Sequence, residues 1–266
     1  MAGDDRSRAP GAQGGLLGAN DFPPVEIINP QGRSPFLLIG DHAGKRIPRA
    51  LGTLGLGAAD RERHIAWDIG TAALGERLAH RLDAVFLRQV YSRLVIDCNR
   101  HPGAADAIPD ISDGTAIAGN RDLATEDRAA RVAGVHEPYQ AAIASEIARR
   151  SRSGIPTMLV SLHSFTPVMN GLPRPWQIGI LHDGANDAMA LRLLGWLRAE
   201  RRWRVGDNEP YVMDATDYTV PRHAFAAGLP YAEIEVSQGE LTSTAGLDTW
   251  EAVLADGLTA VAGATG

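Results

Sequence analysis

The 266-residue chain contains a single cysteine, Cys98. It can therefore form no intramolecular disulfide, and it lacks the several thiolates of a cysteine-ligated metal cluster. Acidic residues outnumber basic ones, which gives a formal net charge of −6. No long run of Lys and Arg offers the positive surface that tracks nucleic-acid phosphates. These scarcities exclude a disulfide-stabilised scaffold and argue against a nucleic-acid-binding protein.

Long apolar runs are also missing. Those present fall well short of the roughly 20 residues needed to span a bilayer, and residues 1–22 contain no apolar core of about 7–15 residues for a signal peptide. We therefore expect a cytoplasmic protein without membrane contacts. Residues 1–22 are rich in Gly, Ala and Asp without hydrophobic periodicity, which predicts a flexible leader. A single domain over residues 23–266 is expected to follow it.

Several catalytic motifs are absent. The chain has neither a GxSxG elbow nor a GxxxxGK[ST] phosphate loop, and the glycines of residues 52–57 lack GxGxxG spacing. Serine hydrolase and nucleotide-binding classes therefore lose support. Cys98 is expected to be a packing residue, because a nucleophilic cysteine needs a placed histidine and a lowered thiol pKa.

Apolar runs and amphipathic segments alternate along the chain, 44% of which is hydrophobic and 22% charged. Short apolar runs bounded by turn residues predict strands at 35–40, 84–89, 93–97, 157–162, 176–181 and 231–236. Three- and four-residue apolar spacing predicts helices at 58–82, 125–150, 187–201 and 247–261. This alternation predicts an α/β fold with one central mixed sheet flanked by helices. Residues 101–120, rich in Gly, Pro and Asp, are expected to form a long loop, either a lid or a merely mobile segment.

Polar residues that follow the predicted strands are the first candidates for a site, because ligands of open α/β sheets gather beyond the carboxyl ends of strands. His42 follows the strand at 35–40, and His163 follows the one at 157–162. Glu235 lies at the end of the last predicted strand. Asp68 interrupts an apolar run of the first predicted helix, where a carboxylate is costly to bury unless it is paired or binds a metal.

Two neutral imidazoles and a carboxylate fill three positions of a tetrahedral zinc ion and leave the fourth for water, as in catalytic sites. His42, Asp68 and His163 are therefore candidate ligands. Alternatives remain open, since a histidine at a strand end is often a hydrogen-bonded structural residue. Asp68 could instead pair with an arginine. His64 lies four residues before Asp68 on the same predicted helix and is either a competing ligand or a surface partner.

The segment at 91–100 surrounds apolar residues with Arg93, Asn99 and Arg100. Guanidinium groups suit bidentate binding of carboxylates, so these residues are candidates for contacts to a carboxylate-bearing substrate. The alternative is that Asp97 and the two arginines form a structural salt-bridge network.

Taken together, these segments resemble the N-formylglutamate amidohydrolase family. The resemblance rests on five segments that fall in the family's order, of which residues 91–100 are the most specific. They are residues 42–48, 67–70, 91–100, 163–165 and 233–238. One position departs from the family pattern, because Asp41 precedes His42 where the histidine-utilisation enzymes more often carry proline.

The resemblance implies a three-layer, phosphorylase/hydrolase-like fold similar to the zinc carboxypeptidases and the acyl-amino-acid deacylases. It implies a zinc ion held by His42, Asp68 and His163, with Glu235 as the catalytic base. It further implies that Arg93 takes part in catalysis and that Asn99, Arg100, Arg222 and His223 bind substrate.

The implied reaction, part of amino-acid degradation, is hydrolysis of N-formyl-L-glutamate to L-glutamate and formate. A deacylase for another small carboxylate-bearing amide and a catalytically inactive carboxylate-binding protein are the alternatives.

Overall fold

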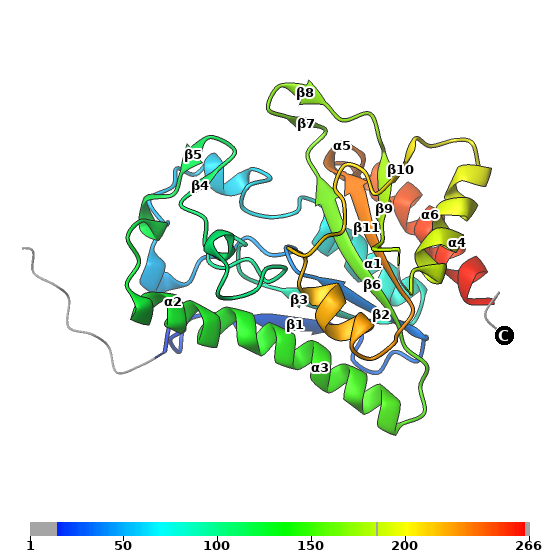
Figure 1. The fold of residues 1–266 in the computed structure, drawn as a ribbon, viewed down its shortest axis with the longest axis horizontal. Helices are drawn as coiled ribbons and strands as arrows, with labels where there is room; N and C mark the ends of the chain where they lie inside the picture. Colours follow the sequence, from blue (N-terminus) through cyan, green and yellow to red (C-terminus); the bar gives the residue numbers. More distant parts are fainter. Residues whose placement is uncertain (1–14, 185, 264–266) are drawn as a thin grey trace, which may run out of the picture.

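A seven-stranded mixed sheet forms the centre of the protein in the computed structural model, which describes residues 15–184 and 186–263 (Figure 1). In spatial order its strands are β1 (Val25–Ile28), β3 (Val85–Gln89), β2 (Phe36–Gly40), β6 (Met158–Phe165), β11 (Tyr231–Ser237), β9 (Ile178–Leu181) and β10 (Val205–Asp207). The four strands from β3 to β11 run parallel to one another. β1 pairs antiparallel with β3, and β9 pairs antiparallel with β11. The predicted mixed sheet is confirmed.

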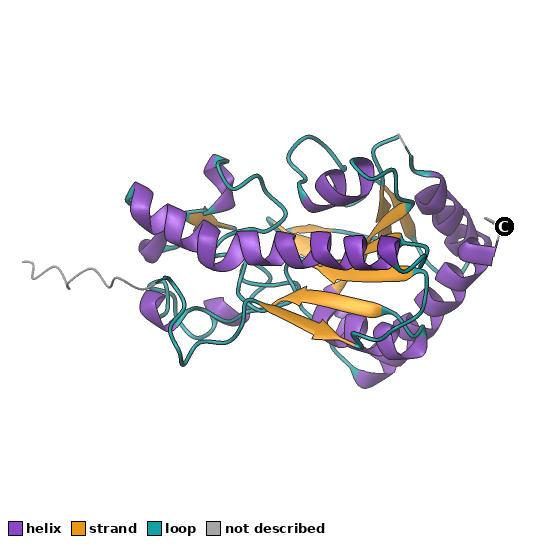
Figure 2. Cartoon of the chain, turned by 90° about the horizontal axis from the view of Figure 1, so that it is seen from below, coloured by secondary structure: helices purple, strands orange, loops and turns teal. Residues whose placement is uncertain are grey.

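Helices cover both faces of this sheet and make three layers (Figures 1 and 2). On one face lie α1 (Thr71–Arg81), α4 (Ala188–Ala199) and α6 (Thr244–Gly263), which pack around Leu38 and Ile234. On the other lies α3 (Glu137–Arg152), which is preceded by α2 (Thr125–Arg131) and packs near Leu37 and Leu87. Alternate residues of each strand thus enter different cores, as the two-residue period of a strand requires.

Shorter elements complete the chain. Two small hairpins pair β4 (Ile111–Ser112) with β5 (Thr115–Ala116) and β7 (Val168–Met169) with β8 (Leu172–Pro173). A single helical turn, α5 (Gln238–Leu241), follows β11. The 3-10 turns are Arg49–Leu51, Asp60–Glu62, Ala105–Ala107 and Ala118–Asn120, and the π-helical turns are Val132–His136 and Pro221–Phe225.

Two expected elements are wrong, and both lie close to the candidate site. The helix expected over 58–82 begins only at Thr71, because Gly70 takes a left-handed conformation with φ of 88° that ends any helix before it. The strand expected over 93–97 is a series of turns, with the Val95 amide donating to the Ser92 carbonyl. Its apolar residues are buried without strand pairing, which periodicity alone cannot reveal. The segment at 101–120 contains the first hairpin and two 3-10 turns.

The expected leader falls partly outside the described residues, at positions 1–14. Residues 15–22 pack on the domain, since Leu16 and Leu17 contact the core on the α3 side. The Tyr91 hydroxyl donates to the Phe22 carbonyl at 2.7 Å, and the Arg46 guanidinium stacks on the Phe22 ring at 3.6 Å. Within the described ranges, none of the helices combines the length and apolar character needed to cross a membrane.

The contact between α1 and β3 yields a stability prediction. Gly75 of α1 faces the buried Phe86 ring so closely that a Cβ would overlap it. We expect Gly75→Ala to lower the free energy of unfolding by about 1–3 kcal/mol, because the overlap outweighs the gain in helix propensity. Urea unfolding would measure the change.

Gly195 of α4 is the matched control, because open space surrounds its position. Gly195→Ala is expected to raise the free energy of unfolding by about 0.5–1 kcal/mol. Equal stabilisation by both substitutions would contradict the packing of α1 on β3.

Candidate active site

Candidate functional side chains meet at the carboxyl ends of three parallel strands. His42 follows β2, His163 lies in β6 and Glu235 lies in β11. Glu235 is paired with His163 in the β11–β6 register. Because neighbouring residues in register point to the same face, both side chains lie on the α3 side of the sheet.

The loop after β2 holds His42 in place by crossing the end of β3. The Arg46 amide donates to the Val90 carbonyl at 3.2 Å, and the Ser92 amide donates to the Arg46 carbonyl at 2.8 Å. Gly44 lies at the crossing, where a Cβ would overlap the Val90 carbonyl. This close approach requires glycine and brings the His42 ring beside the turn that carries Asp97.

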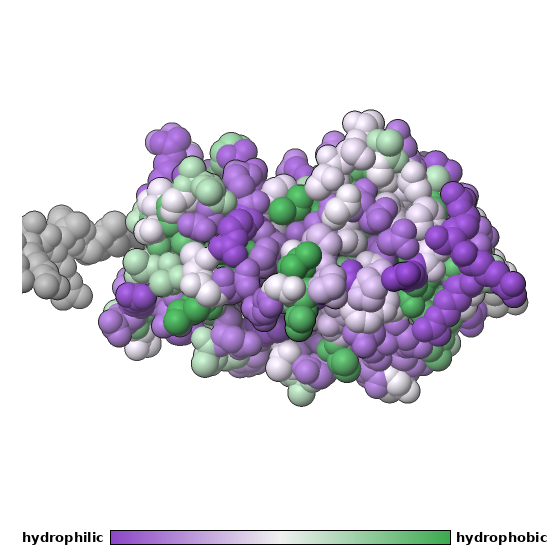
Figure 3. All heavy atoms as spheres, turned by 90° about the horizontal axis from the view of Figure 1, so that it is seen from above, coloured by the Kyte–Doolittle hydropathy of each residue, from purple (hydrophilic) through white to green (hydrophobic). Residues whose placement is uncertain are grey.

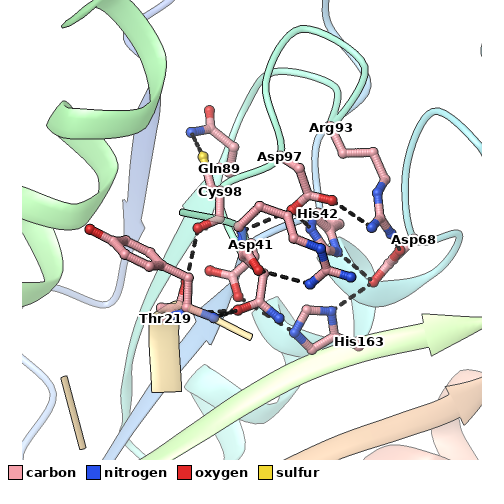
Figure 4. Close-up of polar contacts among 12 residues, drawn as sticks. Asp41, His42, Asp68, Gln89, Arg93, Asp97, Cys98, His163 and Thr219 are labelled. Carbon is pink, nitrogen blue, oxygen red and sulfur yellow. Dashed lines mark hydrogen bonds and ion pairs between the residues drawn. The ribbon is translucent and has the colours of Figure 1, made fainter. Parts of the chain in front are cut away.

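Asp68 reaches the same place from the segment before α1. Its amide donates to the His42 carbonyl at 2.9 Å. Its Oδ2 lies 3.0 Å from His163 Nδ1 and accepts the Ser164 amide at 3.2 Å, while Oδ1 lies 3.7 Å from the Arg93 guanidinium. Figure 4 shows Asp68 between His163 and Arg93, with His42 alongside.

His42, Asp68 and His163 form a group that fits a metal ion. All three are buried, and each offers one ligand atom within 4.8 Å of the other two. His42 Nδ1 has no hydrogen-bond partner among the described residues and lies 3.6 Å from Asp68 Oδ2. Two imidazoles and a carboxylate are the donor set of a catalytic zinc site.

The outer nitrogens of both rings are held from behind. His42 Nε2 lies 2.7 Å from Asp97 Oδ1. His163 Nε2 lies 3.0 Å from Ser161 Oγ and 3.5 Å from Asp41 Oδ2. Partners of this kind fix the ring orientation and the tautomer of histidines that bind metals. The Nδ1 atoms are thereby left to face Asp68.

The charges of the group favour an added cation. Burial opposes ionisation of Asp68, but His42 and His163 beside it hold the pKa of this carboxyl well below its usual range. Burial lowers the pKa of His163, yet Asp41 and Asp68 outweigh this and hold that pKa well above its ordinary value. The raised pKa of His163 shows that the surrounding carboxylates stabilise positive charge at this point.

Glu235 is a buried carboxylate beside this group. Its Oε2 has no hydrogen-bond partner within the described part of the chain. Burial raises its pKa to about 8. An unpartnered, destabilised carboxylate in a cleft is characteristic of a functional group, because a structural carboxylate would have its bonds satisfied. The cleft is a cavity of about 600 Å³ that His42, Asp68, His163 and Glu235 all line.

Comparison with known proteins identifies the family. A family model described as N-formylglutamate amidohydrolase matches residues 34–241. The chain belongs to this family. The family resemblance carried by the sequence motifs is thereby confirmed.

Two solved structures illustrate the likeness. The gene product Atu2144 from Agrobacterium tumefaciens is 31% identical with a TM-score of 0.90, over 94% of this chain and 99% of that one. The N-formylglutamate amidohydrolase from Ralstonia eutropha JMP134 is 20% identical with a TM-score of 0.65, over 90% of this chain and 97% of that one, which shows a shared fold. No curated protein sequence matches the chain.

The most specific family segment, residues 91–100, forms polar contacts within the protein. Arg93 donates to Asp97 at 2.6 Å. The Asn99 amide donates to Asp217 at 3.1 Å, and its oxygen accepts the amides of Tyr218 and Thr219.

Arg100, at the end of this segment, donates to the Thr216 carbonyl and to Asp106. Arg93, Asn99 and Arg100 all line the cavity. Of the salt-bridge network that was the alternative interpretation of this segment, the Arg93–Asp97 pair is present, whereas Arg100 pairs with Asp106 and Asp217.

Arg222 and His223 do not line the cavity. Arg222 is exposed and donates to the Tyr218 hydroxyl at 2.7 Å. His223 is buried, with its Nε2 2.7 Å from Gln140 Oε1. His64 lines the cavity but lies 3.4 Å from Asp113, outside the group of possible metal ligands.

Sequence reasoning missed Asp41 as a partner of His163, although its departure from the family pattern was a signal. Tyr211 also lines the cavity and carried no signal, because no pattern marks its segment. Cys98 is buried, and burial raises the pKa of its thiol well above the usual value. A raised pKa disfavours the thiolate that a nucleophile requires.

Metal content distinguishes the two possible ligand sets. We expect the protein to bind about one zinc ion per chain. His163→Ala should abolish this binding, whereas His64→Ala should keep it, because His163 contacts Asp68 and His64 contacts Asp113 instead. Elemental analysis of both dialysed variants would measure the content. Zinc retained by His163→Ala but lost from His64→Ala would assign the site to His64.

His223 yields a prediction on acid stability. Burial, aided by Arg222, lowers the pKa of His223 to about 4, against about 6.5 in the unfolded chain. Between about pH 4 and 6.5, His223 is protonated in the unfolded chain but neutral in the folded protein. The folded protein therefore loses stability as the pH falls through this window. His223→Gln should reduce the slope of unfolding free energy against pH in this window by up to about 1.4 kcal/mol per pH unit.

Urea unfolding at several pH values would measure that slope. His80, exposed on α1, provides the control, since His80→Gln should leave the wild-type slope in place. An unchanged slope in His223→Gln would contradict a lowered pKa at this position.

Proposed function

We propose that the protein is a zinc-dependent amidohydrolase that releases an amino acid from its N-formyl or another small N-acyl derivative. One observation carries the proposal. Glu235 lines the same cavity as the His42, Asp68 and His163 group, with a buried Oε2 that has no hydrogen-bond partner in the described chain, and it is the residue paired in register with His163. Glu233 shares the buried, unpartnered Oε2 and the cavity but is paired with Ser161. The family supports amide hydrolysis as the reaction class.

In this proposal His42, Asp68 and His163 hold the zinc ion, which when bound polarises the amide carbonyl and makes a water more acidic. Glu235 accepts a proton as the water oxygen attacks the carbonyl carbon. The carbon–nitrogen bond then breaks, and Glu235 returns the proton to the amine nitrogen. The products are a carboxylate, formate for a formyl substrate, and the free amino acid.

Arg93 supports the same reaction from the cavity wall. Its guanidinium lies between Asp97 and Asp68, with part of its side chain exposed to the cavity. A fixed cation in this position can stabilise the negative charge that develops on the carbonyl oxygen. Asp97 holds both Arg93 and His42, so one carboxylate orients both groups.

N-formyl-L-glutamate, the compound in the family's name, is the first substrate to test. Another small N-acyl amino acid is the alternative within the same reaction. A cytoplasmic role in amino-acid degradation is part of the proposal, supported by the family and by the single buried thiol at Cys98.

The proposal predicts formate release that depends on both metal and Glu235. Chelation should abolish hydrolysis, and added zinc should restore it. Glu235→Gln should lower kcat about a hundredfold to ten-thousandfold while keeping bound zinc, because the amide cannot accept the proton. A coupled formate assay and elemental analysis would measure both quantities.

The zinc content of Glu235→Gln is the control that separates loss of the base from loss of the metal. A variant with full zinc and wild-type activity would refute Glu235 as the base. Chelator-resistant hydrolysis would refute the metal. Bound zinc without hydrolysis of any N-acyl amino acid would instead favour a carboxylate-binding protein.

A further inference from the structure

Arg174 is not itself a lining residue of the cavity, but it contacts two residues that are, and it enters none of the roles assigned above. It follows the β7–β8 hairpin, and its guanidinium lies 4.7 Å from the centre of the Tyr211 ring and 6.0 Å from that of Phe165. Its Nη1 atom donates a hydrogen bond to the Tyr211 hydroxyl at 2.8 Å. Phe165 and Tyr211 both line the cavity. Two aromatic side chains therefore hold this cation beside the cavity opening.

The two arginines that line the cavity, Arg93 and Arg100, are already paired with carboxylates. Arg93 contacts Asp97 at 2.6 Å. Arg100 contacts Asp106 at 3.1 Å and lies 3.7 Å from Asp217. By contrast, no carboxylate of the described residues lies within ion-pair distance of Arg174. Its guanidinium therefore has the capacity to bind a carboxylate that a ligand supplies.

Arg174 is also within electrostatic reach of the proposed base. Burial raises the pKa of Glu235, and the positive charge of Arg174 is among those that oppose this rise. A ligand could thus contact Arg174 with one end and present its amide near Glu235 with the other.

Apolar side chains surround the same opening. Met169, Tyr211 and Val212 line the cavity, and Val212 is 62% exposed. Leu172 of the adjacent hairpin is 71% exposed. Figure 3 looks onto this end of the molecule and shows separate green groups among purple atoms rather than one continuous patch. Scattered exposed apolar groups are ordinary on a protein surface, but Met169, Tyr211 and Val212 line the cavity itself and can contact an apolar group of a ligand there.

The remaining charges at the cavity disfavour a second carboxylate. Four aspartates line it away from the proposed metal site, namely Asp106, Asp113, Asp214 and Asp217. Arg100 pairs with Asp106 and Asp217, and Arg63 pairs with Asp113. Acidic residues still outnumber arginines in the lining, so a second negative group on the ligand would meet a net negative charge, which repels it. A guanidinium without a carboxylate partner among the described residues thus lies beside a cavity whose lining combines apolar side chains with a mostly acidic remainder.

We propose that Arg174, held by Tyr211, binds the single carboxylate of an N-acyl amino acid whose side chain is apolar. This inference rests on the proposed amidohydrolase function. It narrows the substrate class, because a dicarboxylate such as N-formyl-L-glutamate would place one carboxylate against the acidic lining.

Three substrates test the proposal on the zinc-loaded protein: N-formyl-L-leucine, its carboxamide N-formyl-L-leucinamide, and N-formyl-L-glutamate. The wild-type protein should hydrolyse N-formyl-L-leucine with a kcat/KM about tenfold to a hundredfold above that of the carboxamide, mostly through a lower KM. It should also prefer N-formyl-L-leucine to N-formyl-L-glutamate. Arg174→Ala should lose the preference for the free acid over the carboxamide, and Arg174→Lys should keep part of it.

Arg100→Ala is the matched control, because Arg100 lines the cavity but is paired with Asp106. It should keep the preference for the free acid. Tyr211→Phe provides a second variant if Arg174→Ala fails to fold. It removes the hydroxyl that holds the guanidinium but keeps the ring, so the preference should fall partway.

The outcomes separate this inference from the proposed function. Hydrolysis of both leucine compounds with an unchanged preference in Arg174→Ala, or loss of the preference in Arg100→Ala instead, would overturn the assignment of Arg174 alone. Faster hydrolysis of N-formyl-L-glutamate than of N-formyl-L-leucine would overturn the single-carboxylate class. A wild-type protein that holds zinc but hydrolyses none of the three would overturn the proposed function and this inference with it.

Discussion

The buried carboxylate of Asp68 is the interaction on which the rest of the site depends. An ionised group this deep is costly unless several partners compensate it. Asp68 is 3% exposed, and its partners come from three other segments: His163 and Ser164 of β6, His42 after β2, and Arg93 after β3. One negative charge thus fixes the relative positions of chain segments far apart in sequence. The contacts that hold this end of the sheet together are therefore also the contacts that assemble the site.

Two further carboxylates, Asp41 and Asp97, extend this arrangement outward. Each lies behind one imidazole and leaves its Nδ1 turned toward Asp68. Asp97 also binds Arg93 and accepts the Asn99 amide at 2.9 Å, so the same side chain closes its own turn. Asp41 occupies the position where the family more often has proline. Proline could not provide this contact, so in this chain the Asp41 side chain adds to the contact that Ser161 makes with His163.

The sequence predicts His42, His163 and Glu235 at strand ends because their strands are short apolar runs that stop at polar residues, a local signal. Asp68 is identified as a buried carboxylate, but its helix is wrong, since Gly70 turns left-handed for a packing reason that apolar spacing does not show. Residues 93–97 form turns because Asp97 and Ser92 bind nearby amides, which competes with strand pairing. Arg174 and Tyr211 meet only through tertiary structure, so no pattern along the chain marks them.

These differences separate two parts of the site with different physical demands. The possible metal ligands and Glu235 lie on strands and on hydrogen-bonded turns. The family segment at 91–100 positions its neighbours, because Asp97 contacts His42 and Asn99 binds residues 217–219. Another part of the cavity lining comes from Met169 of the short β7–β8 hairpin and from residues 210–212. Side chains there can change without disturbing the buried charges below. Under the proposed function, the residues assigned to the reaction thus lie on the sheet, and those assigned to the choice of substrate lie on the hairpin and the segment around Tyr211.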